Sequence, residues 1–145
     1  MTRSPFGSCG DPLSSRFVFA TGIECSYPTV SDVHGRRVRV DQLEQTFHYH
    51  YWQQDLTLVR ELGLRWLRYG PPYYRVHTGP DHYDWEFTDL VFAEMRRLGI
   101  EPIVDLCHFG VPDWVGESGL ASALCPLRPC LRRTLPLGAV LHAGQ

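Results

Sequence analysis

The stretch GIEPIVDLCHFGVPDW, residues 99–114, decides the fold class of this chain. Gly99 stands where a helix C-cap belongs, and PIVDL (residues 102–106) is a short apolar run typical of a buried parallel strand. Polar and aromatic residues follow this run directly. Such side chains at the carboxyl end of a barrel strand form an active-site wall. The stretch therefore predicts an α/β protein with a site at this edge of its sheet.

The order helix, glycine, strand occurs twice in the chain. Apolar residues at helical spacing predict a first helix from about residue 51 to Gly63 and a second one that ends at Gly99. The apolar residues are Trp52, Leu56, Val59 and Leu62 in the first helix, and Phe87, Val91, Met95 and Leu98 in the second. Residues 27–46 are polar, have no clear period and are expected to form a loop.

Three predicted strands accompany these helices, at residues 17–23, 64–69 and 102–106. The distance from Gly63 to Gly99 is that of a βαβ unit. Because βαβ crossovers are right-handed, the strands should lie side by side in a curved parallel sheet that continues into a barrel or a doubly wound fold. No Gly-rich phosphate loop follows the first strand, which disfavours a dinucleotide-binding fold.

Composition excludes several classes of function. A formal charge of −2 gives no reason to expect nucleic acid or an acidic membrane as a partner, and no apolar run is long enough for a signal peptide or a membrane span. Five cysteines at irregular spacings fit neither a disulfide framework nor a zinc site, so we expect reduced thiols, a cytoplasmic location, and no metal or cofactor. The His48-Tyr49-His50 cluster does not change this, since no carboxylate or cysteine completes a ligand set.

Polar and aromatic residues gather where the predicted strands end. These candidate binding residues are Glu24 after the first strand, Arg68 and Tyr69 at the end of the second, His108 and Phe109 after the third, and Trp114. Charged groups that satisfy hydroxyls, together with aromatic carbon that covers a ring face, are what a sugar requires. The predicted ligand is therefore a small-molecule glycoside.

At these residues a resemblance to a known family appears. The pattern HYxxWxxDLxLVxELGLRWLRYGPPYYR (residues 48–75), followed by residues 99–114, resembles the N-terminal part of family 1 glycoside hydrolases, the β-glucosidase group. The likeness covers about residues 17–115 and is greatest to a divergent bacterial branch that is sometimes joined to a sugar-nucleotide reductase. It implies an incomplete (β/α)8 TIM barrel, with the first three βα units only.

The resemblance also implies roles for single residues. Arg68 matches the arginine that lies beside the nucleophilic carboxylate and lowers its pKa, and His108 matches the histidine that bonds sugar hydroxyls. Phe109 stands in place of the usual tryptophan, and Glu24 is the candidate substitute for a sugar-binding glutamine.

The family's chemistry needs two glutamates, which the resemblance places after the fourth and seventh strands in TxNE-like and TENG-like motifs. Neither motif occurs in this chain, so no catalytic residue is predicted and the chain is expected to be inactive. Asp105 and Asp113 are possible replacements, but Asp105 lies an odd number of residues from His108 and should point to the opposite side of its strand.

The chain divides into three predicted parts. Residues 1–16 are expected to be disordered, residues 17–116 to form the partial barrel domain, and residues 117–145 to be an irregular tail. The tail has no acidic residue after Glu117. Codons can be chosen for it that give family-like segments when read one nucleotide later, so we expect the tail to be out of frame. Unpaired sheet edges should make the chain self-associate.

Four alternative functions stay open at this level. The chain is either a piece of an O-glycoside hydrolase or a non-catalytic carbohydrate-binding or interaction module. It is also compatible with part of a hydrolase fused to a sugar-nucleotide reductase. A further, weaker alternative is another clan of retaining barrel hydrolases.

Overall fold

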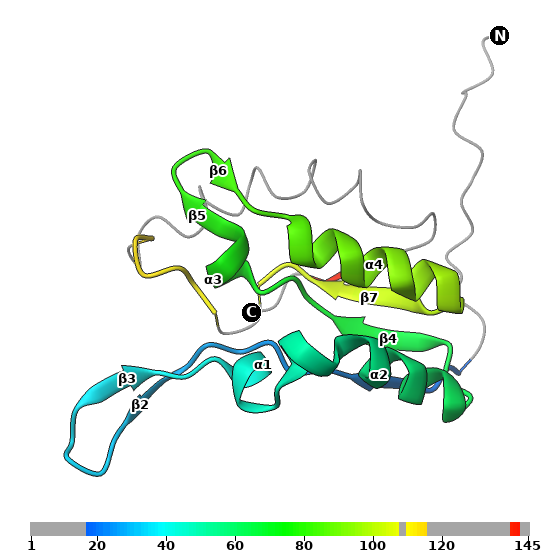
Figure 1. The fold of residues 1–145 in the computed structure, drawn as a ribbon, viewed down its shortest axis with the longest axis horizontal. Helices are drawn as coiled ribbons and strands as arrows, with labels where there is room; N and C mark the ends of the chain where they lie inside the picture. The colour runs from blue at the N-terminus through cyan, green and yellow to red at the C-terminus, as the bar shows by residue number, and fades with distance from the viewer. Residues whose placement is uncertain (1–16, 108–109, 116–139, 143–145) are drawn as a thin grey trace, which may run out of the picture.

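A four-stranded parallel sheet with two long helices on one face forms the centre of the molecule (Figure 1). The computed structural model describes residues 17–107, 110–115 and 140–142. The strands of the sheet, in spatial order, are β1 (Ala20–Gly22), β4 (Trp66–Tyr69), β7 (Glu101–Asp105) and β8 (Val140–His142). The long helices are α2 (His48–Glu61) and α4 (Glu86–Leu98).

Neighbouring strands pair in parallel, as the repeated order of helix, glycine and strand predicts. Ala20 of β1 lies opposite Trp66 of β4, and Trp66 lies opposite Glu101 of β7. Both crossovers run through a long helix, α2 after β1 and α4 after β4. The prediction of three parallel strands with two crossover helices is therefore confirmed.

The core lies between the sheet and the two helices. Alternate strand residues point to the same face of a sheet, and Leu67, Tyr69 and Val104 on the helix-facing side are all completely buried. Phe92 and Met95 of α4 pack against them and are equally buried. Burial of these apolar side chains holds both helices to the same face of the sheet.

Each long helix is followed by a glycine in the left-handed conformation. Gly63 after α2 has φ +74°, and Gly99, the C-cap of α4, has φ +67°. The amide of Gly99 donates to the carbonyl of Arg96, and the amide of Ile100 donates to the carbonyl of Met95. The chain thus turns directly from each helix into the next strand.

The segment of residues 27–46 is not the loop that its polar composition predicts. It contains an antiparallel hairpin of β2 (Thr29–Ser31) and β3 (Arg37–Arg39), followed by the short helix α1 (Gln42–Gln45). The carboxylate of Asp32 accepts hydrogen bonds from the amides of His34 and Arg36 at 2.8 Å each. Side-chain bonds of this kind build a turn without hydrophobic periodicity, which is why the composition did not reveal the hairpin.

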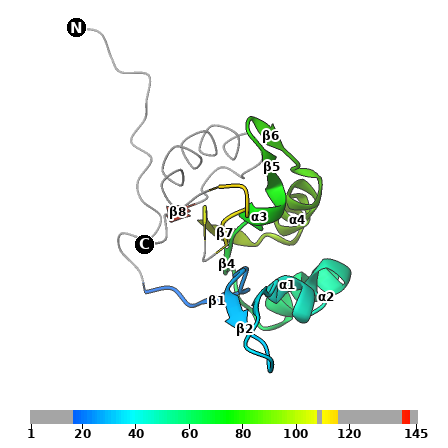
Figure 2. The same cartoon turned by 90° about the vertical axis from the view of Figure 1, so that its left-hand side faces the viewer.

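A second small hairpin follows β4. After the short helix α3 (Tyr73–Val76), strand β5 (His77–Gly79) pairs with β6 (His82–Tyr83), and Asp81 in the turn has φ +59°. Both hairpins and both short helices lie toward the end of the sheet where β4 and β7 finish (Figures 1 and 2).

Most of the two terminal segments lies outside the described residues. The predicted disorder of residues 1–16 therefore stays a prediction, and so does the frame of residues 117–139. Within the tail, Val140–His142 form β8, which pairs in parallel with β7. This strand differs from the expected irregular structure at those three positions. In the part of the chain that the structure describes, no helix is both long and apolar enough to cross a bilayer.

Replacing Gly99 by alanine should lower the free energy of unfolding by about 1–2 kcal/mol, because an L side chain in the left-handed region approaches the carbonyl oxygen that follows it. Asparagine adopts this conformation more readily, so Gly99→Asn is the matched variant and should lose less. Urea unfolding of the three proteins measures the difference. Equal losses for the two variants would contradict a conformational cause.

Candidate functional site

A cavity of about 140 Å³ lies where β1, β4 and β7 end. We call it the rim cavity. Its lining residues are Gly22, Ile23, Glu24, Cys25, Arg68 and Asp105. They lie at or just after the ends of three neighbouring parallel strands, so the fold brings together residues that are far apart in the sequence. Two of the six predicted binding residues, Glu24 and Arg68, lie at this cavity.

An ion pair crosses the rim cavity from β4 to β7. Nη2 of Arg68 lies 2.5 Å from Oδ2 of Asp105, and the Asp105 side chain is only 3% exposed whereas that of Arg68 is 44% exposed. The register places Arg68 opposite Ile103, so Asp105 is two residues further along β7 on the same face. The buried carboxylate therefore fixes a guanidinium whose other side still meets solvent.

Glu24 and Cys25 complete the polar lining. The hydroxyl of Ser26 donates to Oε1 of Glu24, which holds this carboxylate beside the cavity. Burial raises the pKa of the Cys25 thiol to about 12, and the nearby carboxylate of Asp105 acts in the same direction. Cys25 is thus a neutral thiol near pH 7 and is not an activated nucleophile. The sequence had suggested only that it is reduced, and no motif marked its place in the cavity.

Gly70 sets how closely β4 approaches β7 at this point. A Cβ atom on Gly70 would lie 2.5 Å from the carbonyl oxygen of Asp105 and 3.2 Å from the sulfur of Cys25. The first of these distances is shorter than any van der Waals contact. The close approach of the two chains therefore requires a glycine at this position, which the sequence analysis did not single out.

Tyr69 does not reach the rim cavity. It is adjacent to Arg68 on a strand, so its side chain points to the opposite face, where it is completely buried against the helices. Its hydroxyl lies 3.3 Å from Nε2 of His48, whose Nδ1 lies 2.7 Å from Oδ2 of Asp55. Burial raises the pKa of Tyr69 well above its ordinary value. The period of two along a strand already implied this separation from Arg68.

The other predicted binding residues lie elsewhere. The indole N–H of Trp114 donates to the carbonyl of His77 at 2.9 Å, and its ring packs edge-on against the His77 imidazole. Trp114 does not line the rim cavity, although 43% of it is exposed. His108 and Phe109 fall outside the described residues, so their roles stay predictions.

Arg39 of β3 holds the segment of residues 110–115 in place. Its Nη2 donates to the carbonyl of Val111 at 2.6 Å, its Nε lies 3.6 Å from the carboxylate of Asp113, and its guanidinium covers the ring of Tyr27. Tyr27 in turn stacks on Tyr74 with 4.2 Å between ring centroids. The first hairpin and the segment after β7 are therefore joined directly, beside the end of the sheet that carries the cavity.

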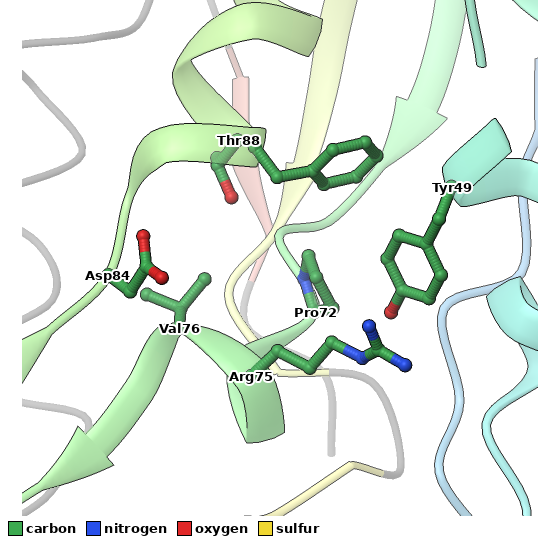
Figure 3. Close-up of a pocket in the computed structure, with 7 residues that line it drawn as sticks. Tyr49, Pro72, Arg75, Val76, Asp84 and Thr88 are labelled. Carbon is green, nitrogen blue, oxygen red and sulfur yellow. The ribbon is translucent and has the colours of Figure 1, made fainter.

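A second, larger pocket of about 280 Å³ lies between the start of α2, α3 and the start of α4 (Figure 3). We call it the Arg75 pocket; it is lined by Tyr49, Pro72, Arg75, Val76, Asp84, Phe87 and Thr88. The guanidinium of Arg75 lies over the Tyr49 ring, 4.0 Å from its centroid, and its Nε donates to Asp41 at 2.9 Å.

Asp41 is the centre of the hydrogen bonds beside this pocket. It caps α1 by accepting from the amides of Leu43 and Glu44, and it also accepts from the hydroxyls of Tyr49 and Tyr74. Arg75 pairs with Asp41 and also with the carboxylate of Glu44, at 2.9 Å each. Its charge is therefore already balanced by protein groups beside the Arg75 pocket. Across the described residues, no three His, Cys, Asp or Glu side chains cluster as a metal site would need.

The fold and the cavity together define the class of protein: an α/β protein with a parallel sheet and a charged cavity at the carboxyl ends of its strands. No family model matches the chain. Over about half of its length it is nevertheless similar to family 1 β-glucosidases and 6-phospho-β-glucosidases.

Two relatives show the extent of this similarity. The 6-phospho-beta-glucosidase AscB of Escherichia coli (strain K12) is 35% identical over 74 residues, which are 48% of this chain and 16% of that protein. The aryl-phospho-beta-D-glucosidase BglA of Bacillus subtilis (strain 168) is 35% identical over 69 residues, 44% of this chain and 14% of that protein. The chain thus spans about a sixth of the length of the curated relatives it matches.

Solved structures show the same fold. The psychrophilic β-glucosidase BglU from Micrococcus antarcticus aligns with 66% of this chain and 23% of its own chain, at a TM-score of 0.58 and 24% identity. A β-glucosidase from Thermotoga maritima aligns with 68% of this chain and 25% of its own, at a TM-score of 0.55 and 16% identity. The sheet β1-β4-β7 with its helices therefore corresponds to part of a TIM barrel.

Substituting Gly70 by alanine should destabilise the protein by about 1–3 kcal/mol, because the added methyl group overlaps backbone that cannot rotate away. The control is Gly79→Ala, where the new Cβ would meet only the Cβ of His82 at 4.0 Å. Thermal unfolding of both variants provides the comparison. If the two lose the same stability, the close approach of β4 and β7 is not the cause.

Thr88 allows a test of the Arg75 pocket. The residue is 1% exposed, and its hydroxyl has no hydrogen-bond partner among the described residues. An unsatisfied buried hydroxyl is unfavourable, so Thr88→Val, which keeps the shape, should stabilise the protein by about 1 kcal/mol. Urea unfolding measures the gain. A loss of stability would show that the hydroxyl is satisfied in solution.

Proposed function

We propose that this chain supplies one wall of the sugar-binding site of a β-glycoside hydrolase barrel and that the 145-residue chain alone does not hydrolyse glycosides. The observation that carries the proposal is the convergence of Glu24, Arg68 and Asp105 from three parallel strands on one cavity. The partial similarity to β-glucosidases and 6-phospho-β-glucosidases supports a β-glucoside as the ligand.

The small volume of the rim cavity supports the proposal that this chain forms only one wall of a sugar-binding site. Small-molecule sites begin at about 300 Å³, and the rim cavity has about 140 Å³. A sugar bound here therefore needs further walls beyond the six lining residues. Within the rim cavity, the half-exposed guanidinium of Arg68 and the carboxylate of Glu24 are suited to bind sugar hydroxyls.

We expect the chain to be inactive because it lacks the pair of carboxylates that glycoside cleavage needs. Retaining cleavage uses one carboxylate as acid/base and a second as nucleophile, about 5–5.5 Å apart. The acidic residues of the rim cavity are Glu24 and Asp105, and the guanidinium of Arg68 already engages Asp105. The chain contains neither the TxNE-like nor the TENG-like motif in which the family carries its two glutamates.

The same observations favour one second function, a non-catalytic carbohydrate-binding module. Charged side chains that bind hydroxyls are present in the rim cavity, whereas the two glutamate motifs are absent from the sequence. Such a module keeps affinity for the glycoside but has no turnover in any assembly.

Two further properties belong to this proposal. We infer a cytoplasmic location, which the free thiols of Cys25 and Cys107 support. We also infer that the chain self-associates, because β1 and β8 end the described sheet on its two sides.

Purified chain should bind an aryl β-glucoside or its 6-phosphate without releasing the aryl group. Arg68→Ala should weaken binding about tenfold or more, since a hydrogen bond to a charged group contributes about 1.5–3 kcal/mol. Arg65→Ala is the matched control, because Arg65 precedes the same strand and its side chain pairs with Glu101 away from the rim cavity. Calorimetry measures binding, and absorbance of the freed aryl group measures turnover.

Two results would contradict the proposal. If the Arg68 and Arg65 variants bind the glucoside equally strongly, the rim cavity is not part of the sugar-binding site. Turnover by the wild-type chain that is lost in Arg68→Ala would show that the chain is a complete catalyst.

A further inference from the structure

The two edge strands of the described sheet run parallel to each other. Its order is β1-β4-β7-β8, every neighbouring pair is parallel, and β1 and β8 are the end strands. A parallel barrel of this kind closes with eight strands. The described sheet therefore contains half of the strands that a closed barrel requires.

The backbone of β1 presents hydrogen-bonding groups on its outer side. The amide of Ile23 donates to the carbonyl of Arg68 at 3.1 Å, so Ile23 faces β4. Alternate residues of a parallel strand bond the same neighbour, and Thr21 therefore faces β4 as well. The N–H and C=O groups of Ala20 and Gly22 point to the opposite side, where they are available to a further strand.

The side chains next to β1 are unusually exposed. Phe17 is 86% exposed and Phe19 is 73% exposed, and all three residues of β1 are exposed or only half-buried. An exposed edge strand flanked by large apolar residues is a template for pairing with another strand.

The two faces of the sheet are packed to different degrees. Leu67 and Val104, which face the helices, are completely buried, whereas Arg68 and Ile103 on the opposite face are exposed and half-buried. In a closed barrel this opposite face is the interior, which is filled by layers of side chains from all strands. Among the described residues, the sheet thus has no further strand at either edge, and its inner face is only partly covered.

We propose that two copies of this chain associate edge to edge and form an eight-stranded parallel barrel, with β1 of each copy pairing with β8 of the other. This inference rests on the self-association proposed above and specifies its geometry. A twofold axis along the barrel axis keeps all strands parallel and makes the two new strand pairings identical, as a closed dimer requires. The arrangement removes both edges and covers both inner faces.

The dimer has a consequence for the rim cavity. Because all eight strands run in one direction, their carboxyl ends lie at the same mouth of the barrel. The two copies of Glu24, Arg68 and Asp105 then face each other across this mouth and enlarge the half-walled cavity of the single chain.

The test uses a substitution on the outer side of β1. Ala20→Pro removes an N–H that does not bond β4, and proline is tolerated on an edge strand. Ala20→Val is the matched control, because valine keeps the N–H and favours a strand. Light scattering coupled to size-exclusion chromatography should give twice the chain mass for the wild type and for Ala20→Val, and half that value for Ala20→Pro.

Hydrogen exchange of residues 17–24 provides an independent readout that does not depend on the proline variant folding. These amides should exchange more slowly as the wild-type concentration rises, since pairing with β8 of a second copy protects Ala20 and Gly22. A monomeric wild type, an open-ended series of larger assemblies, or a dimer that Ala20→Pro leaves intact would each overturn the two-copy barrel.

Failure of this inference is distinct from failure of the proposed function. If the chain is a monomer that binds the aryl glucoside through Arg68, the two-copy barrel is wrong but the proposed sugar-binding role of the rim cavity stands. If the chain is a dimer that binds neither the aryl glucoside nor its 6-phosphate, the two-copy barrel stands but the proposed sugar-binding role is wrong.

Discussion

The pairing of β4 with β7 is the interaction on which the rest of the structure depends. It joins the two βα units of the chain, sets Arg68 and Asp105 on one face, and leaves no room for a side chain on Gly70 between the strand ends. The helices cover only the opposite face. The register of β4 against β7 therefore determines both the apolar packing on one face of the sheet and the ion pair on the other.

Much of this arrangement was predictable from the sequence, because it rests on local signals. Apolar residues at helical spacing, closed by Gly63 and Gly99, located both helices, and the runs after these glycines located β4 and β7. The residues that line the rim cavity were harder to predict from the sequence. Glu24 and Arg68 were predicted from their places at strand ends, but Cys25 and Gly70 matter only through contacts between strands, and no local pattern reports such contacts.

Where the structure differs from the expected arrangement, a physical reason is visible. The hairpin of β2 and β3 depends on Asp32 bonding two amides, which periodicity does not detect. Tyr69 was grouped with Arg68 because both end the same strand, yet neighbours on a strand face opposite sides. Asp105 was set aside as a candidate carboxylate, and its position opposite the Arg68 guanidinium became evident only from the packed sheet.

The contacts of Arg39 have a mechanical consequence. One guanidinium binds the carbonyl of Val111, approaches Asp113 and covers Tyr27, so the first hairpin and the segment after β7 are braced against each other. Neither can shift without straining the other. A displacement of the base of this hairpin would therefore also move residues 110–115, and substitutions in one segment would constrain those tolerated in the other.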